Sequence, residues 1–289
     1  MATLDTVAVT FAHILVPTDF SDVSERALEY AKTLAKPGNS ELLLVHVDPP
    51  VNLITPPEAA WIDDSEIQAM HQEQLEQTGL MLVSQGYRAQ AIELNGPLYD
   101  QLLHAIEEYK VDLIVLGTHG RKGFDRLLLG SDAEALLRHA RCPVLSVGPG
   151  VSDLGNKAWT IREILCAITL EPHAAEVAAY AHKLAAQTGA ELVFFHIKNP
   201  GNQKDSDWSS FEKSFHDHAH AEAKYSFLHG KLANGAPGTS IVEVAKERRS
   251  DLIVMGVRPT AAIRTHLPPG IAAKVLMEAP CPVMTLLQY

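Results

Sequence analysis

The chain has 289 residues, of which 46% are hydrophobic, and its 35 acidic and 24 basic residues give a formal charge of −11. This length suits two ordinary domains, and the hydrophobic content excludes a disordered chain. The negative charge argues against nucleic acid as a partner. The first 20 residues show no targeting signal and no apolar run reaches about 18 residues, so we expect a cytoplasmic protein without membrane contact.

Short apolar runs alternate with segments of helical period in the amino-terminal part of the chain. Residues 21–35 place apolar side chains on one helical face, with Ser21 available as the N-cap. This alternation predicts an open parallel sheet with helices on both faces. The predicted strands are residues 14–18, 41–47, 88–94, 113–117 and 143–147, and the predicted helices are residues 21–35, 65–87, 98–110 and 130–140.

The same pattern returns in the carboxy-terminal part of the chain. "VDLIVLG" (111–117) recurs as "SDLIVMG" (250–256), and "ARCPVLSV" (140–147) recurs as "APCPVMTL" (279–286). Upstream blocks match in the same order, since "ELLLVHV" (41–47) corresponds to "ELVFFHI" (191–197). Each copy is far longer than a solenoid repeat. We therefore predict two domains, residues 1–150 and residues 151–289.

The three cysteines, Cys142, Cys166 and Cys281, are too few and too scattered for a disulfide framework or a zinc site. A small number of scattered cysteines is typical of proteins in a reducing compartment. Cys142 and Cys281 each precede a proline at the start of an apolar run, where we expect a small buried hydrophobic residue.

Parallel sheets of this kind bind ligands beyond the carboxyl ends of their strands. The first such loop holds Pro17, Thr18 and Asp19, and the Asp19 carboxylate suits either a ligand contact or a turn. After the second strand, Val47 can offer backbone polar groups to a flat ring, while we interpret His46 as a histidine at the sheet edge.

The loop after the fourth strand carries the most specific spacing. Gly117, Gly120 and Gly130 are separated by two and nine residues, and Ser131 then opens a helix. Glycines let successive N–H groups converge on an anion, and a helix N-terminus adds partial positive charge. "SDAE" (131–134) is also a capping box, so the serine alone has a structural explanation. The whole spacing favours a polyphosphate ligand.

The combination "ILVPTDFS", "LLLVHV" and "IVLGTHGRKGFDRLLLGSDAEALLRHARCPVLSV" resembles the universal stress protein family over residues 10–148 and, more faintly, over 160–288. The resemblance implies a Rossmann-like fold of the adenine nucleotide alpha hydrolase type, with strand order 3-2-1-4-5 in each copy. It also implies association through the fifth strands, here residues 143–147 with residues 282–286.

In ATP-binding members of that family, residues at two sets of positions hold the nucleotide. By resemblance, Asp19 and Val47 would contact the adenosine part. The glycine loop and its serine would hold ribose and phosphates, and further residues would line the cleft. The phosphate set is Gly117, Gly120, Gly130 and Ser131, and the lining set is Pro17, Thr18, Leu116, His119 and Arg121.

The second copy departs from this pattern at the ligand positions. Thr169 replaces the aspartate, Pro259 replaces the second glycine, and Ile271 replaces the serine. Proline supplies no N–H and isoleucine no hydroxyl, so a phosphate cradle of the first type is not expected there. Loss of ATP binding and an altered ligand are the two interpretations.

A histidine-rich segment, "SFHDHAHAEAKYSFLHG", lies in the second copy. His216 and His220 are four residues apart on a predicted helix, a spacing that suits a metal ion. No cysteine accompanies them, so we expect a solvated, pH-responsive face instead.

The expected function is that of an ATP-binding regulatory protein of stress responses, in which ATP with Mg²⁺ or Mn²⁺ acts as a conformational or assembly switch. The alternatives are a slow ATPase and an ATP-independent interaction module. A Gly-x4-Gly-Lys-(Ser/Thr) loop is absent from the sequence, which argues against efficient phosphoryl transfer. Intrachain pairing of the domains and a homodimer are both compatible with the family resemblance.

Overall fold

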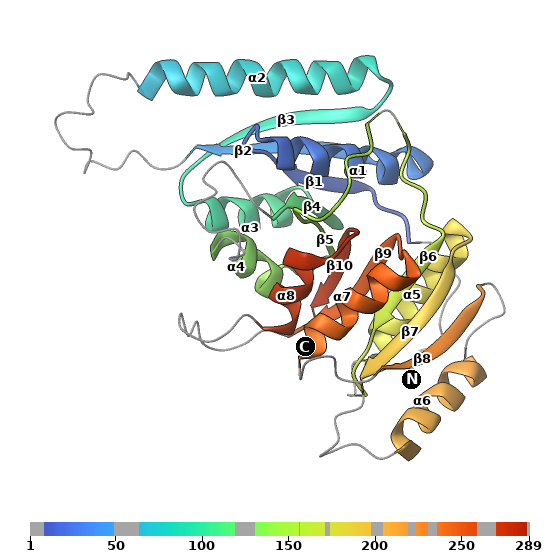
Figure 1. The fold of residues 1–289 in the computed structure, drawn as a ribbon. Helices are drawn as coiled ribbons and strands as arrows, with labels where there is room; N and C mark the ends of the chain where they lie inside the picture. The colour runs from blue at the N-terminus through green and yellow to red at the C-terminus, as the bar shows by residue number, and fades with distance from the viewer. Residues whose placement is uncertain are drawn as a thin grey trace.

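The computed structural model describes most of the chain as regular secondary structure around one sheet (Figure 1). The described residues are 9–48, 64–118, 131–155, 157–170, 174–197, 205–218, 223–230, 236–258 and 270–287.

In the first half of the chain, five strands alternate with four helices, as the sequence predicts. Ser21 is the N-cap of the first helix, and its side chain accepts a hydrogen bond from the Ser24 N–H. The elements are β1 (His13–Pro17), α1 (Asp22–Gly38), β2 (Glu41–Asp48), α2 (Asp64–Ser84), β3 (Arg88–Asn95), α3 (Leu98–Glu108), β4 (Leu113–Gly117), α4 (Ser131–His139) and β5 (Val144–Val147).

The second half repeats this succession of elements. They are β6 (Glu163–Ala167), α5 (Ala174–Thr188), β7 (Glu191–Ile197), α6 (Asp205–His218), β8 (Tyr225–Gly230), α7 (Pro237–Arg248), β9 (Leu252–Val257), α8 (Ile271–Glu278) and β10 (Val283–Leu287).

The strands form a single sheet in the order β3-β2-β1-β4-β5-β10-β9-β6-β7-β8. Within each half the order is 3-2-1-4-5 and the pairing is parallel, which confirms the predicted class of fold. β5 and β10 hydrogen-bond to each other, the two strands for which the family resemblance implies association, and they make the two five-stranded units one continuous sheet.

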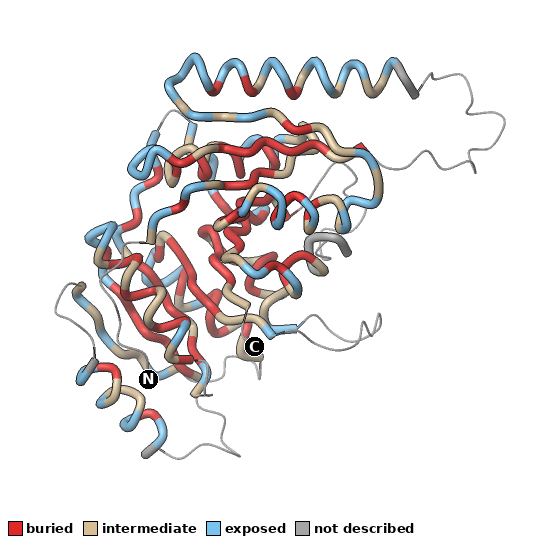
Figure 2. Tube along the Cα trace, turned by 180° about the vertical axis from the view of Figure 1, so that it is seen from behind, coloured by how far each residue is buried: buried red, intermediate tan, exposed pale blue. Residues whose placement is uncertain are grey.

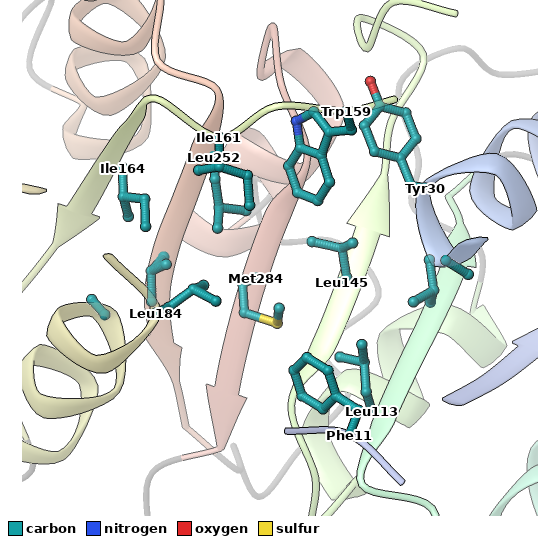
Figure 3. Close-up of a cluster of buried hydrophobic side chains, with 14 of the residues drawn as sticks. Phe11, Tyr30, Leu113, Leu145, Trp159, Ile161, Ile164, Leu184, Leu252 and Met284 are labelled. Atoms are coloured by element: carbon teal, nitrogen blue, oxygen red, sulfur yellow. The ribbon is translucent and has the colours of Figure 1, made fainter. Parts of the chain in front are cut away.

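The join between the halves is the only antiparallel pairing among the described strands. Leu145 lies opposite Met284, and both side chains are buried. Thr285 Oγ1 adds a hydrogen bond to the Val144 carbonyl at 3.3 Å. Figure 3 shows Leu145 and Met284 in the middle of a cluster that draws side chains from both halves. The join therefore has its own hydrophobic core.

The segment between the halves packs on α1 rather than standing away from the protein. Trp159 is buried and meets Tyr30 edge to face, with ring centroids 4.9 Å apart (Figure 3). The Tyr30 hydroxyl donates to the Ser152 carbonyl at 3.0 Å. A Cβ atom at Gly148 would lie 2.5 Å from the Leu276 carbonyl oxygen of α8, so only glycine allows this close approach. These contacts fix the connecting segment against both halves.

Two hydrophobic clusters cover the two faces of the sheet. Alternate residues of each strand enter opposite clusters, so Leu42 and Leu44 of β2 face one side while Leu43 and Val45 face the other. Helices α1, α2, α5 and α6 contribute to the first cluster, and α3, α4, α7 and α8 to the second. Buried residues accordingly concentrate in the strands and on the inward sides of the helices (Figure 2).

The cysteines are free thiols in this core. Cys166 and Cys281 are buried, as a small hydrophobic residue would be, and Cys142 is half-buried. Burial raises the pKa of Cys142 and of Cys281 to about 12, and it also raises the pKa of Cys166. The reactive thiolate is therefore scarce at neutral pH.

A thiol whose pKa lies far above neutral pH is almost entirely protonated, and only the thiolate reacts with disulfides. We therefore expect the thiols of the folded protein to react slowly with a disulfide reagent such as DTNB at neutral pH. The same reagent should label the thiols rapidly once guanidinium chloride unfolds the chain. Rapid labelling of the folded protein would contradict the burial described here.

The Leu145→Ala substitution tests the core of the join. Removing this buried side chain should lower the free energy of unfolding by about 2–5 kcal/mol, because it opens a cavity between β5 and β10. Leu80→Ala is the control, since Leu80 is 69% exposed and should change stability by less than about 0.5 kcal/mol. Urea unfolding measures both, and equal effects would show that the join is not packed as described.

Candidate functional site

The carboxyl ends of β1 and β4 border the crevice in which parallel sheets of this order bind ligands. From β1 the chain proceeds outward to β2 and β3 on one side, and to β4 and β5 on the other. The connections therefore diverge between β1 and β4, which is the topological switch point. Ile14 pairs with Leu113 and Leu15 with Ile114, so the two strands end side by side.

Several residues proposed from the sequence lie along this edge. Pro17 ends β1, Val47 lies near the end of β2, and Leu116 is buried near the end of β4. The Thr18 N–H donates to the Val45 carbonyl at 2.8 Å, which holds the loop after β1 against β2. The structure thus gathers residues from three strands at one edge of the sheet.

Asp19 takes part in a local turn at the rim of the crevice. Its Oδ1 atom accepts a hydrogen bond from the Ser21 N–H at 3.1 Å and another from the Ser21 hydroxyl. Since Ser21 caps α1, the carboxylate is fixed relative to the start of that helix. These hydrogen bonds support the interpretation of Asp19 as a turn residue. They also hold its carboxylate at the carboxyl end of β1.

Gly117 has a packing explanation that the sequence argument did not consider. A Cβ atom at this position would lie 2.7 Å from Val23 Cγ1 and 2.9 Å from the Val23 carbonyl oxygen. Both distances are shorter than carbon and oxygen atoms tolerate, so α1 can approach β4 only where the strand carries glycine. Glycine at 117 is thus required by the fold, whether or not a ligand lies near it.

The remaining proposed residues belong to the loop between β4 and α4. His119, Gly120, Arg121 and Gly130 lie outside the described residues, and so does the side chain of Ser131. The helix α4 begins at Ser131, where the sequence predicts a helix start.

The second half has a cavity of 510 Å³ at the corresponding edge of the sheet, which sequence reasoning did not find. The ends of β6, β7 and β9 and the start of α8 surround it, and α4 of the first half supplies Leu137 and Arg138. Most of its lining is apolar, including Ile168, Met255 and Ile271. Arg258 also lines the cavity. Because α4 reaches this cavity only through the joined sheet, no local sequence pattern signals it.

The start of α8 differs chemically from that of a phosphate-binding helix. Gly270 is its N-cap and provides no side-chain hydrogen bond, and Ile271, at the position that corresponds to Ser131, lines the cavity. The cavity therefore suits an apolar group better than a phosphate.

No helix among the described residues is both long enough and apolar enough to cross a membrane.

Comparison with known proteins finds a family match in each half of the chain and relatives that each match about half of it. The profile of the universal stress protein family matches residues 10–148 and 160–286. Universal stress protein MJ0531 of Methanocaldococcus jannaschii is 38% identical over 141 residues, which cover 47% of this chain and 82% of that protein. Universal stress protein YxiE of Bacillus subtilis is 32% identical over 147 residues, covering 47% of this chain and 99% of that protein.

A solved structure extends the likeness to the whole chain. The crystal structure of a universal stress protein from Archaeoglobus fulgidus superposes with a TM-score of 0.75 at 23% identity and covers 96% of each chain. That likeness concerns the fold, while the two profile matches concern the sequence of each half. The chain therefore belongs to the universal stress protein family, with two copies of the family's fold joined in one sheet.

Proposed function

We propose that residues 1–150 form an ATP-binding domain and that residues 151–289 form a second domain that does not bind ATP. ATP would occupy the crevice between β1 and β4, with Mg²⁺ or Mn²⁺ on its phosphates. The protein would act as a nucleotide-dependent regulator of a stress response, in which ATP favours one conformation or assembly over another.

The observation that carries this proposal is the grouping of Thr18, Asp19 and Val47 at the carboxyl edge of the sheet, next to the switch point between β1 and β4. The Asp19 carboxylate is a hydrogen-bond acceptor for ribose hydroxyls or the adenine amino group. The glycine spacing that precedes α4 supplies the chemistry for phosphates, because backbone N–H groups and a helix N-terminus favour anions. These donor and acceptor types fit a nucleotide.

The second half supports the asymmetry of the proposal. At the positions of Asp19 and Ser131 it carries Thr169 and Ile271, and both residues line its cavity. That cavity presents apolar side chains where a phosphate would need N–H groups. Arg138 and Arg258 also line the cavity, so the loss of the carboxylate and of the serine hydroxyl, rather than a lack of cations, disfavours a triphosphate there.

Isothermal titration of nucleotide-free protein with ATP and Mg²⁺ tests the stoichiometry, and we expect one ATP per chain. Gly120→Val should abolish binding, because a branched side chain would occupy the space that a phosphate needs. Pro259→Val, at the corresponding position of the second half, is the matched control and should leave binding unchanged. Two ATP molecules per chain, or equal binding by both variants, would refute the asymmetric proposal.

The contribution of Asp19 can be separated from its role in the turn. Asp19→Asn retains a side-chain oxygen that can accept from the Ser21 N–H, but it removes the negative charge. We expect ATP affinity to fall about 10-fold, in line with the loss of one hydrogen bond to a charged group. Thr169→Ala is the control in the second half. An unchanged affinity of the Asp19→Asn protein would remove the aspartate from the site.

Measuring phosphate release from ATP by the unchanged chain and by the Gly120→Val protein distinguishes an ATP-binding regulator from a slow ATPase. We expect no sustained phosphate release above the level of the Gly120→Val protein, because the sequence has no Gly-x4-Gly-Lys-(Ser/Thr) loop of the kind that supports efficient phosphoryl transfer. Phosphate release by the unchanged chain that Gly120→Val eliminates would instead favour the enzyme.

A further inference from the structure

A cluster of two imidazoles and a carboxylate lies at the end of β2, on the face that α2 covers. His46 and Asp48 are two residues apart on the strand, so their side chains point to the same face. His71 comes from α2, where it shares the inward side of the helix with the buried residues Leu75 and Leu82. Strand alternation and helical period together bring the three side chains to one place.

The three potential ligand atoms form a nearly equilateral triangle. Asp48 Oδ1 lies 3.0 Å from His71 Nδ1 and 3.3 Å from His46 Nε2, and the two nitrogen atoms are 3.2 Å apart. In a tetrahedral zinc site with bonds of about 2.0–2.1 Å, neighbouring ligand atoms are about 3.3–3.4 Å apart. The triangle therefore matches one face of such a tetrahedron, contracted by a few tenths of an ångström.

A backbone contact orients His46 for this role. Its Nδ1 atom lies 2.8 Å from the Thr18 carbonyl oxygen, and only a protonated nitrogen can donate to a carbonyl. In the neutral ring, Nε2 then carries a lone pair directed at the cluster. Metal-binding histidines are commonly held in this way by a carbonyl on the opposite ring nitrogen.

Asp48 supplies a buried carboxylate to the same place. The residue is 3% exposed, and its Oδ2 atom has no hydrogen-bond partner among the described residues. Glu93 of β3, which pairs with His46 of β2, brings a second carboxyl group next to that of Asp48. A divalent cation bound here would compensate the buried negative charge of Asp48.

Phe20 closes the cluster from the side of the β1 loop. Its ring centroid lies 4.7 Å from that of His46 and 5.6 Å from that of His71. The residue reaches this place with a positive φ of 59°, an unfavourable backbone conformation for an aromatic residue. Phe20 therefore limits the access of water to the imidazoles.

The second half keeps the histidine that corresponds to His46 but lacks the residues that correspond to Asp48 and His71. His196 occupies the position of His46, and its Nδ1 atom lies 3.1 Å from the Ile168 carbonyl oxygen, as His46 does from that of Thr18. Two residues later the sequence has Lys198 instead of an aspartate. Trp208 of α6, the helix that corresponds to α2, stacks on the His196 ring with centroids 5.1 Å apart. The fold alone therefore does not require an aspartate and a second histidine at these positions.

We propose that His46, Asp48 and His71 bind a divalent transition metal ion with the ligand preference of Zn²⁺. Two imidazole nitrogens and one carboxylate oxygen are a donor set typical of zinc, and a water molecule or Glu93 would complete four ligands. Among the described residues, this is the one group of three histidine, cysteine or acidic side chains close enough to hold a metal ion together. Its residues come from β2 and α2 and not from the loop between β4 and α4 to which the proposed function assigns the phosphates.

The experiment is a titration of chelator-treated, nucleotide-free full chain with Zn²⁺ in competition with a chromophoric chelator. We expect one tightly bound Zn²⁺ per chain. Asp48→Asn, which keeps the size of the side chain, and His71→Ala should each weaken binding by more than about 100-fold, because even outer-shell changes at metal sites cost about 10–100-fold. The visible spectrum of the Co²⁺-substituted protein should show tetrahedral coordination and should lose that signature in both variants.

Two further histidine variants serve as controls. His104→Ala removes a histidine whose side chain is 70% exposed, and His216→Ala interrupts the histidine-rich segment of the second half. Both should bind Zn²⁺ as the unchanged chain does, and circular dichroism melts establish that every variant is folded. Absence of stoichiometric Zn²⁺ binding by the unchanged chain would overturn the proposal. Undiminished Zn²⁺ binding by both the Asp48→Asn and His71→Ala proteins would also overturn it, as would loss of Zn²⁺ binding by the His216→Ala protein. Because the metal is measured directly and without nucleotide, this result is independent of ATP binding.

Discussion

The pairing of β5 with β10 is the constraint on which the rest of the architecture depends. A five-stranded unit of either half ends in a strand whose outer N–H and C=O groups would be open to uncontrolled pairing. The antiparallel join satisfies these groups and buries Leu145 against Met284. It also brings α4 of the first half beside the second half, so that Leu137 and Arg138 line a cavity whose other walls come from residues after position 166. The two repeats are therefore one folded body, with hydrophobic clusters that run through both.

The two halves share a backbone and differ at the carboxyl edge of the sheet. The strands keep alternating apolar side chains, as Leu42 and Leu44 in β2 and Leu192 and Phe194 in β7 illustrate. The loops change, from Asp19 to Thr169 and from Ser131 to Ile271. Packing constrains the strands because each inward side chain meets several neighbours, whereas loop residues at the edge are constrained mainly by what they bind. A duplicated domain can thus change its ligand chemistry while it continues to complete the sheet.

The end of β2 shows how one strand can serve two sides of the sheet. His46 and Asp48 face α2, while Val47 between them belongs to the opposite face, among the residues that pack with α3 and α4. The loop after β1 is attached to this strand at two points. The Thr18 carbonyl accepts a hydrogen bond from the His46 ring, and the Thr18 N–H donates to the Val45 carbonyl of β2. The proposed metal and nucleotide sites are accordingly neighbours that use different atoms of the same short segments.

The sequence by itself determined the elements, their order, the duplication and the class of fold, because hydrophobic period and capping residues such as Ser21 are local signals. It also located the candidate nucleotide residues at strand ends, of which those after β1 and β2 lie at one edge of the sheet. Only the tertiary structure decided which distant residues meet. Val23 against Gly117 explains a glycine that spacing alone had assigned to a ligand. His71 beside His46 and Asp48, and the cavity shared by the two halves, also arise from packing. Contacts of this kind depend on how helices settle on the sheet and on how the sheet is joined, and no local pattern records either.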